Sequence, residues 1–163
     1  MDCRRRISYP STSAGVYPFR YNLLMAAKAA KPPTVAGLTW IGALKFSAAV
    51  NKASLIIDSD GVAGPSPVDA LAVALAGCMA TDVTHVLTKG RHPLRALRAH
   101  FAGERAQEDP HRFLRIDLHF TVEGGVPRDA VQRAIALSRE KYCSVWHSMR
   151  QDIDFVVTFE LRD

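Results

Sequence analysis

Apolar and polar residues alternate along the first regular stretch of the chain. Over residues 38–48, apolar side chains recur at every second position, and polar residues such as Lys45 lie between them. A period of two is typical of a half-buried β-strand. The pair Asn51-Lys52 then indicates a tight turn into a second strand over residues 53–58.

A long helix is predicted after a loop. Residues 59–67 are dense in glycine, proline, serine and aspartate, which is typical of a loop. At the end of this loop, Ser66 is placed to cap a helix and Pro67 suits the first helical position. Asp69 completes a capping box with Ser66. We expect the helix to continue to about Lys89, because glycine follows it.

The first half of this helix is apolar on every side. Residues 70–80 form an uninterrupted apolar run of eleven residues. A bilayer needs about 20 such residues, so we expect no transmembrane segment and no membrane partner. A helix that is apolar all round is expected to be buried all round. In so small a domain, this helix needs a sheet on one side and a further cover, such as a second subunit.

Two more strands, a second helix and a last strand are predicted in the second half. Residues 94–106 alternate loosely, residues 112–122 alternate cleanly, and residues 153–161 form the last alternating stretch. Pro127 opens the second helix. The residues expected to point inward from the 112–122 strand are Leu114, Ile116, Leu118, Phe120 and Val122. Those expected on the apolar stripe of the helix are Val131, Ala134, Ile135, Ser138 and Tyr142.

The predicted order is strand, strand, helix, strand, strand, helix, strand. Hairpins together with two long helices indicate an α+β fold with an antiparallel sheet. At 163 residues, the chain is long enough for one such domain and too short for two ordinary ones. We place the domain at residues 37–163.

The charge of the chain is concentrated in its N-terminal segment. The formal net charge of +5 lies entirely in residues 1–36, and residues 37–163 hold equal numbers of basic and acidic side chains. The domain therefore has no net positive field to attract nucleic acid. The segment 1–36 is rich in serine, proline, alanine and arginine without a sustained period, so we expect a basic, disordered extension.

The three cysteines, Cys3, Cys78 and Cys143, are far apart in the sequence. No CxxC, HExxH or clustered cysteine and histidine motif is present, so the spacing predicts no metal site. The N-terminal residues lack the apolar core of a signal peptide. These features favour a reducing cytoplasm. Cys3 lies in the extension, and we treat it as incidental.

Cys78 and Cys143 are the candidates for chemistry, and two interpretations of each stay open. A free cysteine is often a small buried hydrophobe, and it can equally be a reactive thiol. Asp82 and His85 share a helical face with Cys78, but a carboxylate raises a thiol pKa. His85 lies about 10 Å along the helix, too far for a catalytic dyad with Cys78. Near Cys143, Arg139 and Lys141 favour a thiolate and the helix end disfavours one.

Two motifs together resemble the OsmC/Ohr family. Residues 64–78 read GPSPVDALAVALAGC, and residues 140–145 read EKYCSV. The resemblance covers about residues 38–162, and the first motif looks closer to the YhfA-like branch than to the best-studied peroxidases. It implies an intertwined homodimer in which the buried cysteine helices pack centrally and each active site lies at the subunit interface.

The resemblance also implies an enzyme, a thiol-dependent peroxidase of the oxidative stress response. Cys78 would be the peroxidatic residue, and Cys143 would condense with its sulfenic acid to a disulfide. The substrate would be an organic hydroperoxide, and a dithiol such as a lipoyl group would be the reductant. No metal, flavin or haem cofactor is implied.

The chain departs from the peroxidase pattern at two activating positions. The family's peroxidases use an arginine from the early strands, where this chain offers only Lys45 and Lys52. They use a glutamate at the start of the cysteine helix, where Val68 stands, followed by Asp69 as a helix cap. Arg139, Arg150 or a cation from a second subunit is left to hold Cys78 as a thiolate. The alternative function is therefore a non-catalytic OsmC-like protein that binds a small molecule or senses redox state.

Overall fold

A computed structural model describes residues 31–163, of which Val35–Asp163 form one compact unit. Residues 1–30 of the predicted extension lie outside the described residues. The elements are, in chain order, β1 (Ala36–Gly42), β2 (Lys45–Val50), β3 (Ala53–Asp58), α1 (Pro67–Lys89), β4 (Ala96–Arg105), β5 (Phe113–Glu123), α2 (Arg128–Leu137), the π-helical turn η1 (Ser138–Tyr142), α3 (Ser144–His147) and β6 (Asp154–Arg162).

The first three strands form an antiparallel sheet in the order β1-β2-β3. The turn at Asn51 between β2 and β3 is confirmed. The single strand expected over residues 38–48 is wrong, because the chain reverses at Ala43 and Leu44, between the paired residues Gly42 and Lys45. Gly42 and Ala43 both have positive φ angles. This two-residue reversal preserves the alternation of apolar residues, so the period of two does not reveal it.

Helix α1 begins and ends where its capping residues predict. The Ser66 side chain accepts a hydrogen bond from the Asp69 backbone N–H at 3.2 Å, and the Asp69 carboxylate accepts one from the Ser66 N–H at 3.3 Å. The capping box is therefore present, with Pro67 in the first turn, and the helix ends at Lys89. These contacts are local, so the sequence around them is enough to place the helix.

The loop that leads into α1 is held by a buried carboxylate. Asp58, at the end of β3, accepts hydrogen bonds from the backbone N–H of Asp60 at 3.1 Å and of Ala63 at 2.9 Å. Lys45 lies 3.9 Å from the same carboxylate. These donors, chiefly the Ala63 N–H, lower the pKa of Asp58. Lys45, one of the two lysines in the region of the family's activating arginine, therefore lies at the loop.

The last three strands form a second sheet in the order β4-β5-β6. Strands β4 and β5 are antiparallel, whereas β5 and β6 are parallel. The α+β class is confirmed, but the expectation of a single antiparallel sheet is wrong. The helical segment from α2 to α3 carries the chain back along the sheet after β5, so β6 starts at the same end as β5.

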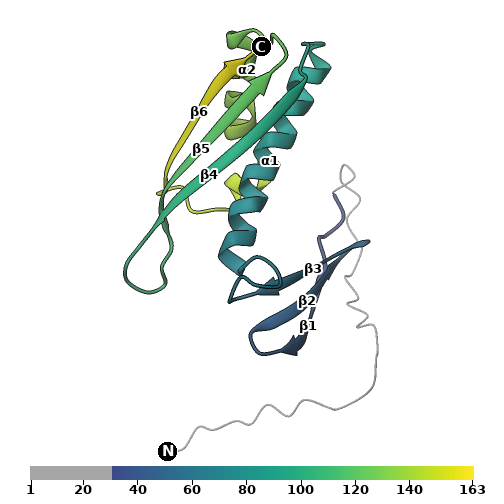
Figure 1. The fold of residues 1–163 in the computed structure, drawn as a ribbon, viewed down its shortest axis with the longest axis vertical. Helices are drawn as coiled ribbons and strands as arrows, with labels where there is room; N and C mark the ends of the chain where they lie inside the picture. Colours follow the sequence, from purple (N-terminus) through teal and green to yellow (C-terminus); the bar gives the residue numbers. More distant parts are fainter. Residues whose placement is uncertain (1–30) are drawn as a thin grey trace, which may run out of the picture. The chain divides into compact units, whose positions relative to one another are not determined.

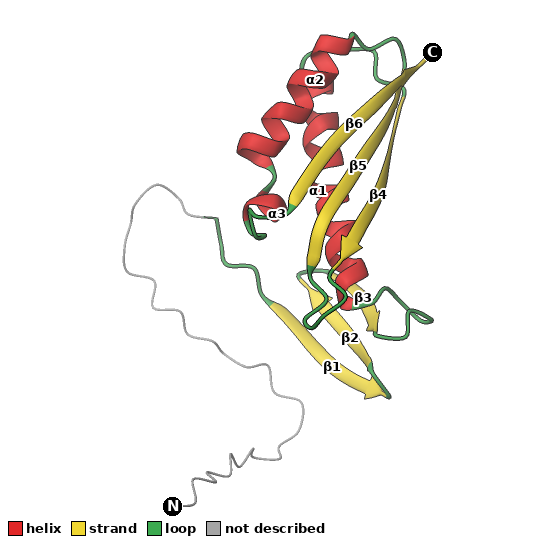
Figure 2. Ribbon diagram, turned by 90° about the vertical axis from the view of Figure 1, so that its left-hand side faces the viewer, coloured by secondary structure: helices red, strands yellow, loops and turns green. Residues whose placement is uncertain are grey.

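Helices α1 and α2 pack against one face of the second sheet (Figures 1 and 2). The core between them contains buried residues from both helices and from β5 and β6. The buried residues of β5 are Phe113, Ile116, Leu118, Phe120 and Val122. Leu114 was expected to point inward and is exposed instead, because a register shift at the start of β5 places Phe113 opposite Arg105.

The apolar run of α1 is covered on only one side within the described chain. Leu75, Met79, Val83 and Leu87 are fully buried. Val73 is 68% exposed, and Leu71 is exposed as well. The expectation that this half of the helix is buried all round is therefore not met by one copy of the chain.

Among residues 31–163, helix α1 alone is long and apolar enough to cross a membrane, with a mean hydropathy of 1.6. The core helices of soluble proteins often have the same length and composition, so this is a weak indication of a membrane span. The expected lack of a transmembrane segment stays a prediction.

Candidate active site

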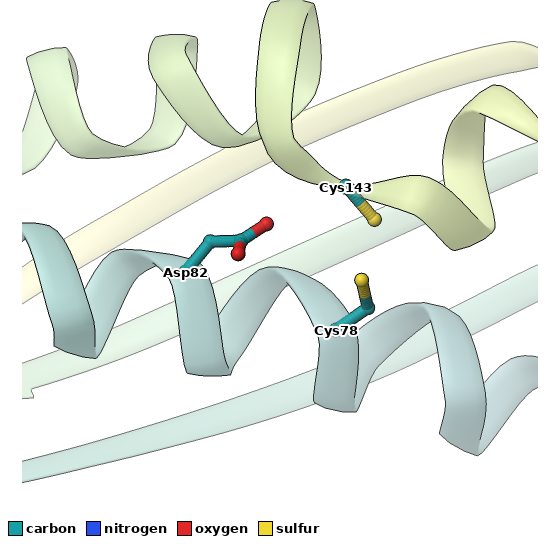
Figure 3. Close-up of side chains that lie close together, drawn as sticks. All are labelled: Cys78, Asp82 and Cys143. Carbon is teal, nitrogen blue, oxygen red and sulfur yellow. The ribbon is translucent and has the colours of Figure 1, made fainter. Parts of the chain in front are cut away.

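The two cysteines of the sequence motifs meet between α1 and the chain that follows α2. Cys78 lies in α1, and Cys143 lies between η1 and α3. The Sγ atoms of both and a carboxylate oxygen of Asp82 all lie within 4.8 Å of one another. Figure 3 shows the three side chains pointing toward one another. Both cysteines are free thiols. Their proximity could not be inferred from their separation in the sequence.

The turn η1 determines which residue points toward Cys78. The sequence predicts a regular helix with Tyr142 on its apolar stripe, but residues 138–142 form a π-helical turn instead. A π-turn has more residues per turn than an α-helix, so it rotates the following positions around the axis. Tyr142 is therefore exposed, which corrects the prediction, and Cys143 is buried toward α1.

Cys143 is a buried thiol in a largely apolar environment. Its Sγ accepts a hydrogen bond from the backbone N–H of Trp146 at 3.4 Å, and the Trp146 ring packs against Phe155. Burial is the main cause of a raised pKa at Cys143, and the neighbouring Cys78 and Asp82 raise it further. Cys143 is consequently a protonated thiol at neutral pH.

Cys78 is more accessible than Cys143. Its side chain is only partly buried, whereas Cys143 is fully buried. The preceding residue, Gly77, is exposed, and a side chain added there would meet nothing within 4 Å. The open space lies at Gly77 itself, so the expectation that small residues leave room beside the Cys78 sulfur stays a prediction. Within the described chain, Cys78 is therefore the more exposed of the two thiols.

Asp82 belongs to the site, although the sequence suggested only a polar helix end. Its carboxylate accepts a hydrogen bond from the Ser138 hydroxyl at 2.8 Å. Ser138 is fully buried on η1, as expected for the apolar stripe. The available signal was the four-residue spacing from Cys78, which puts Asp82 on the same face of α1. His85 is exposed on α1 and outside the cluster.

The cations proposed to activate Cys78 are engaged elsewhere. The Arg150 guanidinium donates two hydrogen bonds to Asp152, at 2.9 and 2.7 Å. The Arg139 guanidinium lies over the Phe155 ring, 5.4 Å from its centre. Within residues 31–163, no lysine or arginine makes a hydrogen bond or ion pair with either sulfur or with Asp82. The cluster therefore lacks a positive partner from the described part of the chain.

The fold and the paired thiols define an α+β protein with a dithiol site, and the comparison with known families agrees. The sequence profile described as "OsmC-like protein" matches residues 58–158, which include both cysteines. The chain therefore belongs to the OsmC-like family, and the resemblance of its two motifs is confirmed.

Named relatives and solved structures agree with this family. The chain is 36% identical over 128 residues to Protein YhfA of Escherichia coli strain K12, a match that covers 78% of this chain and 92% of that protein. A hypothetical protein from Aquifex aeolicus has the same fold, with a TM-score of 0.76 and 23% identity over 81% of this chain and 98% of its own. A Legionella pneumophila structure described as an organic hydroperoxide resistance protein OsmC has a TM-score of 0.61 and 16% identity, covering 80% and 98%.

Proposed function

We propose that this protein reduces organic hydroperoxides with Cys78 as the peroxidatic residue and Cys143 as the resolving residue. The observation that carries the proposal is the position of the two Sγ atoms within 4.8 Å of each other, from segments far apart in the sequence. Membership of the OsmC-like family supports a redox role. The description of the Legionella structure as a hydroperoxide resistance protein supports the same class of substrate.

In the first step, we assign the attack on the hydroperoxide to Cys78, because Cys143 is buried and protonated. The Cys78 thiolate attacks the distal oxygen of the hydroperoxide, so an S–O bond forms while the O–O bond breaks. The alkoxide leaves and takes up a proton to become the alcohol. Cys78 is oxidised by two electrons to a sulfenic acid.

The second step makes and then reduces a disulfide. The Cys143 sulfur attacks the sulfenic sulfur, an S–S bond forms, and the hydroxyl leaves with the thiol proton as water. A small dithiol such as a lipoyl group then exchanges with the disulfide, returns both thiols and becomes a disulfide itself. We propose the cytoplasm as the location, because a reducing compartment supplies such dithiols.

A homodimer is part of the proposal, with the cysteine helices packed centrally and a site at each interface. The uncovered face of α1 supports it, since Val73 and Leu71 are exposed apolar residues. A groove of about 500 Å³ runs along this face, and its lining includes Ala72, Ala76 and Ala80. Small residues let another element approach closely. The first sheet also exposes large apolar residues, such as Trp40 at 65%.

A second candidate is a non-catalytic protein that binds a small molecule or senses redox state. This candidate is favoured by the surroundings of the thiols: Asp82 lies beside them, and within residues 31–163 no lysine or arginine makes a hydrogen bond or ion pair with the cluster. A carboxylate disfavours the thiolate that attacks a peroxide. The absence of an activating glutamate at Val68 points the same way.

Mass spectrometry of the reduced protein separates the two candidates. We expect one equivalent of cumene hydroperoxide to lower the intact mass by about 2 Da, because disulfide formation removes two hydrogens. Peptide mapping should then find Cys78 joined to Cys143. An unchanged mass with both thiols free would contradict the peroxidase and favour the binding protein.

Single variants identify the role of each cysteine. Cys78→Ser should abolish peroxide consumption, whereas Cys143→Ser should allow one turnover and accumulate an oxidised Cys78 without a disulfide. Cys3→Ser is the matched control and should behave like the unaltered protein. Full activity in Cys78→Ser would contradict the mechanism.

A further inference from the structure

We propose that Cys78, Asp82 and Cys143 bind a thiophilic divalent cation of the zinc class when both cysteines are reduced. Each residue supplies one ligand atom, and the three atoms lie within 4.8 Å of one another. Sulfur and carboxylate oxygen are ligand types that Zn²⁺ prefers. This site goes beyond the proposed peroxidase, although it uses the same two sulfurs.

The spacing of the ligand atoms is compatible with a tetrahedral ion. Bond lengths of about 2.3 Å to sulfur and about 2.1 Å to oxygen hold ligand atoms about 3.6–3.8 Å apart in a tetrahedral zinc site. The three side chains therefore need shifts of about 1 Å at most from their present positions. Cys78 and Asp82 lie one turn apart on the same helix, so α1 holds two of the ligands rigidly.

Charge at the cluster also favours a cation. The described residues provide an aspartate and two thiols at this position, and no lysine or arginine among them makes a hydrogen bond or ion pair with the cluster. Cys143 is protonated in the metal-free protein, so binding of the ion must release its proton, and the two thiolates of the bound state would repel each other and the carboxylate without the ion. A divalent ion offsets this repulsion and stabilises both thiolates at once, which one hydrogen bond from Trp146 does not do.

Outer hydrogen bonds already orient two of the ligands. The Ser138 hydroxyl donates to the Asp82 carboxylate at 2.8 Å, and the Trp146 backbone N–H donates to the Cys143 sulfur at 3.4 Å. Such second contacts fix the direction of ligand atoms in metal sites. These hydrogen bonds leave the other Asp82 oxygen free to bind the ion. The partly buried side of the cluster, at Cys78, leaves a position for a water molecule as the fourth ligand. Three protein ligands with one open position are typical of exchangeable or catalytic zinc sites.

Metal binding and disulfide formation exclude each other. A Cys78–Cys143 disulfide consumes both thiolates, so the oxidised protein has one ligand left and is expected to release the ion. Conversely, a bound ion occupies the electron pairs with which Cys78 attacks an oxidant. The site is therefore a metal site controlled by the redox state of the two cysteines.

Cobalt titration of the reduced protein tests the site. Co²⁺ should bind with one equivalent and produce the near-ultraviolet thiolate-to-cobalt band and the visible bands of a tetrahedral complex. The experiment is performed in the Cys3→Ser background, so that a third thiol does not contribute. Asp82→Asn should weaken binding at least about tenfold. Asp129→Asn, an exposed carboxylate on α2, is the matched control and should have no effect.

A second measurement leaves all three proposed ligands unaltered. Stoichiometric Zn²⁺ should protect Cys78 of the Cys3→Ser protein from iodoacetamide, and removal of the ion with a chelator should restore labelling. The peroxide-oxidised protein should bind no Co²⁺. Cobalt binding without a thiolate band, equal affinity in Asp82→Asn, or no protection by Zn²⁺ would overturn the site.

Failure of this site and failure of the peroxidase are distinguishable, because the cobalt titration contains no peroxide. A protein that gives the cobalt spectrum but no disulfide retains the metal site and loses the proposed reaction. A protein that forms the disulfide but binds no cobalt shows the reverse.

Discussion

The reactivity of a cysteine depends on what surrounds its sulfur, and Cys78 and Cys143 differ in this respect. Cys143 is fully buried and accepts one backbone hydrogen bond from Trp146. Cys78 is partly buried beside the exposed Gly77. The greater accessibility of Cys78 and the raised pKa of Cys143 support the different tasks proposed for two thiols whose sulfur atoms lie within 4.8 Å.

Alkylation of the reduced, metal-free protein should follow the same difference. We expect iodoacetamide to label Cys78 before Cys143, because only a thiolate reacts and the pKa of Cys143 is raised by burial. Labelling of Cys143 should increase only at a pH above the ordinary thiol value of about 8.5. In denaturant, where burial is lost, the pH at which Cys143 becomes labelled should fall to that value. Peptide mapping across a pH series measures both, and equal labelling of the two cysteines at pH 8 would contradict the assignment.

At the scale of elements, small irregularities position the site. The π-turn η1 adds residues to one turn of helix and directs Cys143 inward in place of Tyr142. The loop before α1 is a second such feature, because the Asp58 carboxylate binds its backbone N–H groups. Apolar periodicity predicts neither feature. Each depends on the position of one side chain in the folded protein, Cys143 for the turn and Asp58 for the loop.

Asp58→Asn tests the role of the loop. The variant should be less stable than the parent at pH 7, because a neutral amide accepts the hydrogen bonds of Ala63 and Asp60 less strongly. The pKa of Asp58 is lowered in the folded state, so its stabilisation is present above the unfolded value near 3.9 and is lost as the pH falls through the folded value. Urea unfolding at several pH values measures the difference.

The control for this experiment is Asp60→Asn, since Asp60 is exposed in the same loop. It should change stability little at any pH. A stability difference between Asp58→Asn and the parent that persists unchanged below the folded pKa would show that charge at Asp58 is not the cause.

At the scale of the whole molecule, two apolar surfaces are left uncovered by residues 31–163. One lies on α1 at Val73, and the other lies on the first sheet, where Trp40 and Leu38 are exposed. Exposed apolar surface of this kind is typical of protein interfaces. The proposed homodimer would cover it.

Val73→Asp should weaken the proposed dimer at least about tenfold, because an unpaired carboxylate would be buried at the interface. The residue is 68% exposed in the single chain, so the fold of one copy should be unchanged. Gln132→Asp, exposed on α2, is the matched control. Sedimentation velocity measures both, and a monomeric parent protein or an unaltered Val73→Asp dimer would contradict the interface.

Local signals in the sequence were sufficient to predict the elements that are stabilised by residues close to them in the sequence. The capping box of Ser66 and Asp69 located the start of α1, and the alternation over residues 112–122 located β5. The two cysteine motifs were sufficient for the family, and the matching profile over residues 58–158 includes both. In each case the physical cause acts within a few residues or within a continuous motif.

The tertiary structure alone decided the features that depend on distant residues. It paired β6 parallel to β5, rotated Cys143 inward through η1 and brought Asp82 to the two sulfurs. Cys78 and Cys143 are separated by 64 intervening residues, so no spacing rule reveals that their sulfurs meet. Packing of α2 and η1 on α1 sets that proximity, because buried side chains fix the rotation and position of each helix.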